Sequence, residues 1–409
     1  MLLKRSGFVL AVVTTTYAAV LSAPAQADDT IKIGVLAEMS GPFAPYGKQI
    51  TTGMKAYMKL HGEKVGGKKI ELIIKDTTGP APEVAKRLAQ ELVMRDKVQF
   101  LAGFGLTPNA LAVAPVATEA KVPMVIMNAA TSVIPTKSPY IVRVSFTLPQ
   151  VTAPMAEWAA KNKIKRVYTL VTDYAPGLDA EATFKKVFIA AGGEIVGSVR
   201  VPLRNPELAP FVQRIKDARP EAVFIFTPAG EAAVAFMKAF NDRGLAQAGI
   251  KLIGTGDVTE DEVIEAMGDA ALGTITTHHY SAAHKSPQND AFKKAFAAVA
   301  GQTRPNFMAV GGWDGMHVIY AMVRAQAQAE GGKIDGKIGG KIGGKIDGDK
   351  AIEAVKGMTI QSPRGPITID PATRDVVQDV YVRRVEKVGN EHFNVELDKF
   401  ARVKDPGKP

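Results

Sequence analysis

Apolar and polar positions along the chain alternate between a period of two and a helical period, which predicts strands followed by helices. Residues 31–36 form a short apolar run bounded by turn residues, as expected of a buried strand. Residues 82–96 instead repeat apolar side chains at helical spacing. Strands that alternate with helices indicate parallel βαβ units. Further elements of this first lobe are expected as strands at residues 70–75, 98–103 and 122–127 and as a helix at 108–119.

The same alternation starts again after residue 146 and predicts a second lobe of the same class. Two similar α/β lobes side by side place a crevice between the carboxyl ends of their strands, where ligands bind in open sheets. The expected helices lie at residues 151–161, 179–191, 207–217 and 231–243, and the expected strands at 166–171, 194–201, 222–226 and 250–253.

The remaining residues are divided between the lobes. Long helical patterns at 288–300 and 307–330 have no strands of their own and are expected to cover the first lobe, whereas β-rich pieces at 367–369 and 376–385 are expected in the second. We therefore predict an α/β fold of two doubly wound, Rossmann-like lobes, joined where the chain crosses between them three times. The crossings are expected near residues 144–147, 277–280 and 358–361. The predicted boundaries are a signal peptide at 1–27, lobe 1 at 28–146 plus 280–358, and lobe 2 at 147–279 plus 359–409.

The first residues have the pattern of a secretory signal peptide. Lys4 and Arg5 precede an almost uncharged apolar stretch at residues 7–20, and Ala25-Gln26-Ala27 matches an A-x-A cleavage site. Cleavage after Ala27 would leave an exported chain. No later run of about 18 apolar residues is long enough to span a membrane, so the mature chain is expected to be soluble.

Composition excludes several classes of function. The chain has no cysteine, which rules out cysteine nucleophiles and cysteine metal sites. Its formal net charge is +10, but the basic residues are spread along the chain, which disfavours a nucleic-acid surface and suits attraction of anionic ligands. Residues 333–348 repeat K-I-x-G four times, and so short a repeat predicts a surface loop in lobe 1 with no core of its own.

No catalytic motif is present. The sequence lacks a G-x-S-x-G elbow, an H-E-x-x-H zinc motif and a phosphate-binding P-loop. His278, His279 and His284 form a histidine cluster, but adjacent strand residues point to opposite faces, which makes His278 and His279 a poor chelating pair. We expect no metal, no cofactor and no catalytic residue.

Polar and aromatic residues gather instead where the predicted strands end. Helix starts that carry backbone N–H groups and hydroxyls can receive a carboxylate, and Thr107 and Thr131 are suitably placed for this, although either could be a plain helix cap. The candidate ligand-binding residues are Phe43, Tyr46, Leu106, Thr107, Ala129, Ala130, Thr131, Tyr174 and Asp257.

Several stretches, in this order and spacing, resemble type I periplasmic binding proteins of ABC importers, in the leucine/isoleucine/valine-binding protein family. They are IKIGVLAEMSGPFAPYG, GLTPNALAVAPVATEAKVPMV, NAAT, TDYAPGLDAE and GTGDVTED, within a similarity that covers residues 31 to about 385.

The resemblance implies two lobes that close on a ligand without catalysis. It implies a carboxylate held near Leu106, Thr107, Ala129 and Thr131, aromatic contacts from Tyr46 and Tyr174, and an ammonium partner at or beside Asp257. The implied partners are a small-molecule ligand and an inner-membrane permease, with a periplasmic monomer and no nucleic acid.

One feature departs from the amino-acid binders of this family. Their other tyrosine from the second lobe falls around Thr227-Pro228-Ala229 and is missing here. An aromatic acid without an ammonium group would suit such a pocket, whereas Asp257 favours an amino acid unless it meets a ligand hydroxyl. A periplasmic solute receptor for a small carboxylate is the leading interpretation. The alternatives are a ligand-sensing receptor domain for a signalling partner and, less favoured, an exported α/β hydrolase.

Overall fold

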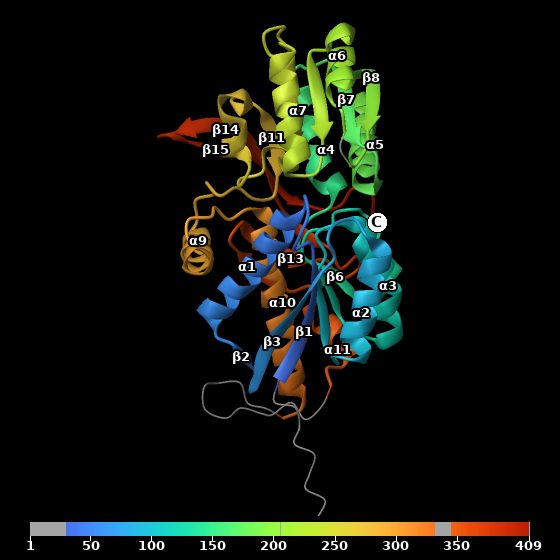
Figure 1. Cartoon of the computed structure of the whole chain (residues 1–409), viewed down its shortest axis with the longest axis vertical. Helices are drawn as coiled ribbons and strands as arrows, with labels where there is room; N and C mark the ends of the chain where they lie inside the picture. The colour runs from blue at the N-terminus through green and yellow to red at the C-terminus, as the bar shows by residue number, and fades with distance from the viewer. Residues whose placement is uncertain (1–29, 205, 332–344, 409) are drawn as a thin grey trace, which may run out of the picture.

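The computed structural model describes residues 30–204, 206–331 and 345–408, and it forms two α/β lobes, each built on its own sheet (Figure 1). The predicted signal peptide and most of the K-I-x-G repeat lie outside the described residues. No helix within the described ranges is both long and apolar enough to cross a membrane.

The first lobe is a sheet in the order β2-β3-β1-β4-β5-β6, with parallel pairing from β3 through β6. Alternate side chains of β1 point to opposite faces, so Ile33 and Val35 join one hydrophobic core and Leu36 joins another. Helices α2 and α3 contribute to the core around Leu36, and α1 to the other. The elements are β1 (Thr30–Ala37), α1 (Ala44–His61), β2 (Lys64–Val65), β3 (Lys68–Asp76), α2 (Pro82–Met94), β4 (Phe100–Gly103), α3 (Thr107–Ala120), β5 (Met124–Ile126), η1 (Ile134–Lys137) and β6 (Ile141–Arg143).

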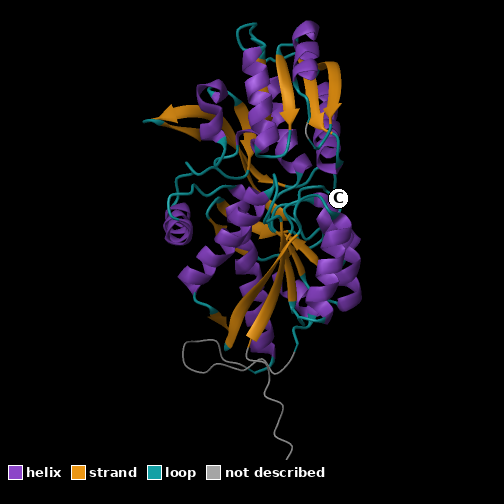
Figure 2. Cartoon of the chain, viewed as in Figure 1, coloured by secondary structure: helices purple, strands orange, loops and turns teal. Residues whose placement is uncertain are grey.

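The second lobe repeats this plan, with a parallel sheet in the order β8-β7-β9-β10-β11 that β14 extends in antiparallel pairing (Figure 2). Its elements from the middle of the chain are α4 (Leu148–Lys161), β7 (Arg166–Thr172), α5 (Ala175–Ala190), β8 (Glu194–Val201), α6 (Ala209–Ala218), β9 (Ala222–Phe226), α7 (Glu231–Asp242), β10 (Lys251–Thr255), η2 (Gly256–Thr259), α8 (Ile264–Met267), η3 (Gly268–Ala271) and β11 (Ile275–His278).

The last part of the chain serves both lobes. Helices α9 and α10 pack on α1 of the first lobe, and α11 packs on α10. Strands β14 and β15 pair in a long hairpin on the second sheet. Within the described residues, the chain therefore passes between the lobes three times: after β6, after β11 and through β12 and β13. The elements are α9 (Pro287–Ala300), α10 (Phe307–Ala329), α11 (Gly348–Val355), β12 (Thr359–Ser362), β13 (Gly365–Ile369), β14 (Val376–Val388) and β15 (Glu391–Val403).

Helices α1 and α10 cross unusually closely because glycines face each other's backbone. A Cβ atom added to Gly312 would lie 2.1 Å from the carbonyl oxygen of Ile50, and one added to Gly53 would lie 2.0 Å from that of Ala309. This contact binds the late segment of the chain to the first helix and so completes the first lobe.

Two features of the tail differ from the sequence prediction. Strand β15 was not predicted, because its half-exposed residues include many charged side chains that do not read as a buried strand. The hairpin of β12 and β13 was assigned wholly to the second lobe, yet Ser362 and Arg364 contact Asp314 on α10 of the first lobe. This hairpin thus links the two lobes.

The end of the K-I-x-G repeat leads directly into α11. The side chain of Asp347 caps this helix by accepting a hydrogen bond from the Lys350 N–H.

Candidate functional site

Both lobes place their strand ends at the interface between them. The direction of winding in the first sheet reverses between β1 and β4, and in the second sheet it reverses between β7 and β9. Such switch points are where open α/β sheets bind ligands. The loops after β1, β4 and β5 therefore face the loops after β7, β9 and β10.

A small cavity of about 20 Å³ lies between these loops. This is room for about one water molecule by the usual measure. The phenol of Tyr46, which lines the cavity, spans the interface and donates a hydrogen bond to the Ala229 carbonyl of the second lobe at 3.2 Å. The lining residues are Tyr46, Gly105, Leu106, Thr107, Asn128, Ala130, Phe146, Leu148, Tyr174, Pro176, Phe226 and Asp257.

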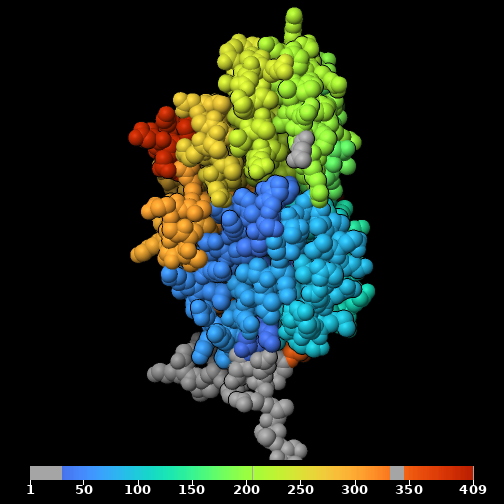
Figure 3. All heavy atoms as spheres, viewed as in Figure 1, coloured from blue at the N-terminus to red at the C-terminus, as the bar shows by residue number. Residues whose placement is uncertain are grey.

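The structure shows the lobes in a closed arrangement. Direct hydrogen bonds besides that of Tyr46 join them, among them those from Gln49 to Glu262 at 2.9 Å, from the Ser132 N–H to Asp179 at 3.0 Å, and from Arg204 to the Pro80 carbonyl at 3.2 Å. In the space-filling view the two lobes meet along a continuous boundary (Figure 3). A ligand the size of an aromatic acid therefore has to separate the lobes or their side chains in order to bind.

The first-lobe end of the cavity suits an anion. Leu106 is the N-cap of α3, and its apolar side chain makes no capping hydrogen bond to the first N–H groups of the helix. Helix α5 begins in the same way at Tyr174, from the opposite lobe. Uncapped helix starts carry partial positive charge and free N–H donors. Helix α4, by contrast, is closed by a capping box between Thr147 and Gln150.

The two threonines occupy positions other than those expected. Thr107 is the first residue of α3 and not its cap, and its hydroxyl donates to the Thr131 hydroxyl at 3.1 Å. Thr131 lies in the loop after β5, two residues before the Val133 cap of η1. Both hydroxyls are buried, so the pair links the two loops that end β4 and β5.

Aromatic rings form the walls of the cavity. Tyr174 and Phe226 stack with ring centroids 6.1 Å apart at an angle of 19°. On another side, Phe146 contacts the rings of His278 and His279 at 4.7 and 4.8 Å. The expectation that these histidines point apart was wrong: their ring centroids are 4.3 Å apart, because His279 lies beyond the end of β11, where the strand alternation no longer holds. Among the described residues, no group of three or more His, Asp or Glu side chains is placed to hold a metal.

Asp257 gives the second-lobe side of the cavity a carboxylate. One of its oxygens accepts a hydrogen bond from the Thr255 hydroxyl at 2.9 Å and lies 3.7 Å from Nε2 of His278. Burial lowers the pKa of His278 to about 4, so this histidine is neutral at physiological pH and Asp257 has no cationic partner in it. Burial, and then the charge of Asp257, raises the pKa of the Tyr174 phenol well above its usual value.

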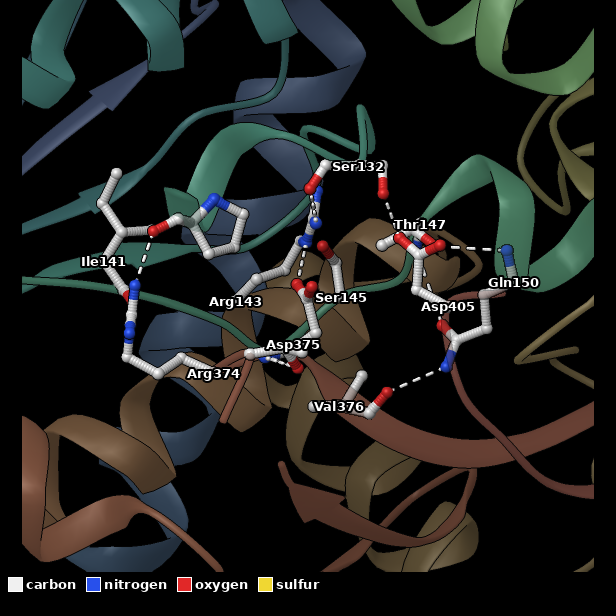
Figure 4. A network of polar contacts seen from close by, with 12 residues as sticks. Ser132, Ile141, Arg143, Ser145, Thr147, Gln150, Arg374, Asp375, Val376 and Asp405 are labelled. Carbon is white, nitrogen blue, oxygen red and sulfur yellow. Dashed lines mark hydrogen bonds and ion pairs between the residues drawn. The ribbon is translucent and has the colours of Figure 1, made fainter. Parts of the chain in front are cut away.

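A buried ion pair holds the loop after β5 in place (Figure 4). The Arg143 guanidinium at the end of β6 binds Asp375 at 2.7 Å. It also donates to the carbonyls of Ala129 and Thr131 at 3.0 and 2.7 Å. Lys408 forms a second ion pair with Asp375. The loop after β5 is therefore tied to residues just before β14.

The structure brings together six of the predicted site residues, and these line the cavity as Tyr46, Leu106, Thr107, Ala130, Tyr174 and Asp257. Ala129 and Thr131 lie in the same loop but behind the lining. Phe43 packs edge-on against Tyr46 with centroids 5.4 Å apart and lines a separate outer groove of about 470 Å³ between the lobes.

Sequence reasoning missed the lining residues Gly105, Asn128, Phe146, Leu148, Pro176 and Phe226. Phe226 and Asn128 do follow the signal used for the others, since Phe226 is the last residue of β9 and Asn128 lies in the loop two residues after β5. Phe146 and Leu148 lie where the chain crosses between the lobes, and their position becomes evident only when the hinge is in place.

Comparison with known proteins agrees with this geometry. Residues 30–390 match the family described as periplasmic binding protein. The chain belongs to this family of periplasmic solute-binding proteins. It is 45% identical to the Leu/Ile/Val-binding protein homolog 6 of Brucella melitensis, over 95% of this chain and 96% of that protein.

Two solved structures of solute-binding proteins of ABC transporters from Rhodopseudomonas palustris are also similar to this periplasmic binding protein. The protein from strain BisB5, in complex with 3,4-dihydroxybenzoic acid, is 54% identical with a TM-score of 0.86 and covers 93% of this chain and 100% of its own. The protein from strain HaA2, in complex with p-hydroxybenzoic acid, is 45% identical with a TM-score of 0.87 and covers 93% and 99%. The predicted fold and family are confirmed, and with them the role of solute-binding component of an ABC importer.

Proposed function

We propose that this periplasmic binding protein captures an aromatic carboxylate that carries a ring hydroxyl, and delivers it to an inner-membrane ABC permease. The observation that carries the proposal is the make-up of the cavity lining. The start of α3 contributes to it from the first lobe, Asp257 from the second, and four aromatic rings also line it. A hydroxybenzoate has the matching groups, a carboxylate, a ring and a hydroxyl.

Each end of the site is assigned one part of the ligand. The ligand carboxylate binds the N–H groups at Leu106 and Thr107, with the hydroxyls of Thr107 and Thr131 beside it. The ring packs against Tyr46, Phe146, Tyr174 and Phe226. The phenolic hydroxyl donates to Asp257. A charge-assisted hydrogen bond of this kind favours the hydroxylated ring over the plain ring.

Two observations favour this ligand over an amino acid. The stretch Thr227-Pro228-Ala229 supplies no tyrosine, and the Ala229 carbonyl already accepts the hydrogen bond of Tyr46. The similar proteins from R. palustris that bind hydroxybenzoates are at least as similar to this chain as the Leu/Ile/Val-binding homologue.

Binding and closure are coupled in this proposal. The ligand contacts the first lobe through α3 and the second through Tyr174 and Asp257, so it has more contacts in the closed state than in the open one. Only such a difference in contact shifts an equilibrium between conformations. The protein acts as a monomer without catalysis or cofactor, and its signal peptide is removed after Ala27.

The proposed function is tested by binding measurements on protein that has been unfolded and refolded to remove carried-over ligand. The panel contains 4-hydroxybenzoate, 3,4-dihydroxybenzoate, benzoate, terephthalate and leucine. We expect the hydroxylated acids to raise the melting temperature most, since a ligand at 100 times its Kd adds about 2.7 kcal/mol to the stability of a folded state that alone binds it. A response to leucine, with none to the aromatic acids, would contradict the proposal.

Asp257→Asn tests the hydroxyl end of the site. We expect the Kd for 4-hydroxybenzoate to rise by about tenfold or more, because a hydrogen bond to a charged group contributes about 1.5–3 kcal/mol, and the Kd for benzoate to change by less than about threefold. Isothermal titration calorimetry measures both. Asp173→Asn is the matched control, since Asp173 is exposed in the loop after β7 and does not line the cavity. Equal weakening for both ligands would mean that Asp257 does not bind the hydroxyl.

A further inference from the structure

A buried carboxyl group lies directly behind the anion end of the cavity. Glu38 follows the last residue of β1, at the switch point of the first sheet, and is fully buried. One of its oxygens accepts a hydrogen bond from the side-chain amide of Asn109 at 2.9 Å. Asn109 lies in the first turn of α3 and also donates to the Gly79 carbonyl at 2.9 Å. The carboxyl group is therefore attached to the helix whose start faces the ligand.

The other oxygen of Glu38 faces the cavity wall. A Cβ atom added to Gly105 would lie 2.1 Å from this Oε2 and 3.2 Å from the ring of Tyr46. Both Gly105 and Tyr46 line the cavity. Among the described residues, Oε2 is buried without a hydrogen-bond partner. Only the backbone of a glycine separates it from the space where the ligand carboxylate is placed.

Among the residues that the structure describes, no cation is close enough to Glu38 to stabilise its ionised form. Its neighbours are Thr77 from the end of β3, Asn109 from α3, the Leu106 backbone and, as the titratable group, Tyr46 from α1. Burial raises the pKa of Glu38 to about 7, although the hydrogen bond from Asn109 and the nearby polar groups of Thr77 and the Leu106 backbone partly oppose this. Near neutral pH this group therefore exists in both protonation states.

We propose that Glu38 is a positioning residue for the loop of Gly105, Leu106 and Thr107, and that an anionic ligand binds there with uptake of a proton by the Glu38 carboxyl group. The neutral acid holds the start of α3 through Asn109 without repelling the ligand. The ionised form places a second negative charge behind the same backbone and competes for the Leu106 N–H. The inference rests on the proposed function, in that it needs the ligand carboxylate at this end of the cavity.

The sign of the pH dependence follows from the two states. A bound anion on the other side of Gly105 raises the pKa of Glu38 further, because like charges disfavour ionisation. Binding is then tightest at low pH, where Glu38 is already neutral, and weakens as the pH rises above about 7. If binding takes up one proton, the Kd rises by nearly tenfold per pH unit between the pKa of Glu38 in the free protein and its pKa in the complex.

The test is calorimetric titration of the full protein with benzoate between pH 6 and 8.5, in buffers of different ionisation enthalpy. Benzoate keeps a single negative charge over this range, so a change in Kd reports the protein. We expect the Kd to rise by about tenfold or more from pH 6 to 8.5 and the apparent enthalpy to depend on the buffer. Glu38→Gln keeps the shape and the contact with Asn109, and it should bind at every pH about as tightly as the wild type does at pH 6.

Glu260 provides the matched control. Glu260 is a buried carboxyl group of the second lobe, directly after η2. Burial raises its pKa to about 8, and its charge also raises the pKa of Tyr46. Glu260→Gln should keep the pH dependence of the wild type. A wild-type Kd that is constant with pH, a dependence that persists in Glu38→Gln, or one that disappears in Glu260→Gln would each overturn the inference. Tight, pH-independent binding would do so while leaving the proposed function intact, whereas failure of every aromatic acid to bind would remove both.

Discussion

Replacement of Asp375 by asparagine is expected to lower the free energy of unfolding by about 3–5 kcal/mol, because it leaves the buried Arg143 guanidinium without its counter-charge. Neither side chain is more than 5% exposed, and their ion pair is 2.7 Å long. Lys408, which is mostly buried, loses the same partner. The asparagine keeps the shape of the side chain, so the loss measures charge and not packing.

Asp379→Asn is the matched control for this experiment. Asp379 lies on β14, four residues after Asp375, and pairs with Lys399, whose side chain is largely exposed, so its charge is expected to contribute less than about 1 kcal/mol. Urea unfolding followed by circular dichroism measures both variants. Equal losses at the two positions would show that the Arg143 pair has no special importance. We also expect weaker ligand binding in Asp375→Asn, since Arg143 orients the Ala129 and Thr131 carbonyls.

Gly312→Ala is expected to lower the free energy of unfolding by about 3 kcal/mol or more. The new methyl group would lie 2.1 Å from the Ile50 carbonyl oxygen and force α1 and α10 apart. The two helices cannot relax this contact by rotating a side chain, because the obstacle is backbone. The expected result is a lower urea midpoint for the whole protein, measured by circular dichroism.

A second glycine of α10, Gly315, provides the control for Gly312→Ala. A Cβ atom at Gly315, one turn further along α10, would meet the terminal methyl of Met127 at 2.3 Å, and this flexible side chain can move aside. Gly315→Ala should therefore be far less harmful than Gly312→Ala, and the gain in helix propensity of about 1 kcal/mol offsets part of its cost. Similar losses in both variants would contradict the assignment of Gly312 to the helix crossing.

The sequence predicted the fold well because the central parallel strands are buried on both faces. Such strands read as short apolar runs, as in residues 222–226, and the helices between them keep a clear period. The hairpin of β14 and β15 was harder to predict. Its second strand is an edge strand with charged residues such as Glu396, Asp398 and Lys399, and its pairing depends on a partner that only the folded lobe supplies.

The candidate site was predictable in part for a related reason. Strand ends such as Leu106 and Asp257 are located by the strands, so the topology alone brings them together. Phe146 lines the cavity because the chain crosses between the lobes there. Glu38 can pack against the backbone of Gly105, a lining residue, because Gly105 has no side chain. A charged residue after an apolar strand is ordinarily read as exposed, and no pattern in the sequence reveals that this one is enclosed.

The triple passage of the chain between the lobes has a consequence for biosynthesis. The first sheet is complete by β6, but its α1 face stays uncovered until α9 and α10 exist, and the second sheet lacks its β14 edge until nearly the last residue. Neither half can therefore reach its final form on a nascent chain that is still short. Domains of contiguous sequence fold one after another as they emerge. Here neither lobe is contiguous in sequence, so we expect both lobes to complete their folding together, after most of the chain has been synthesised.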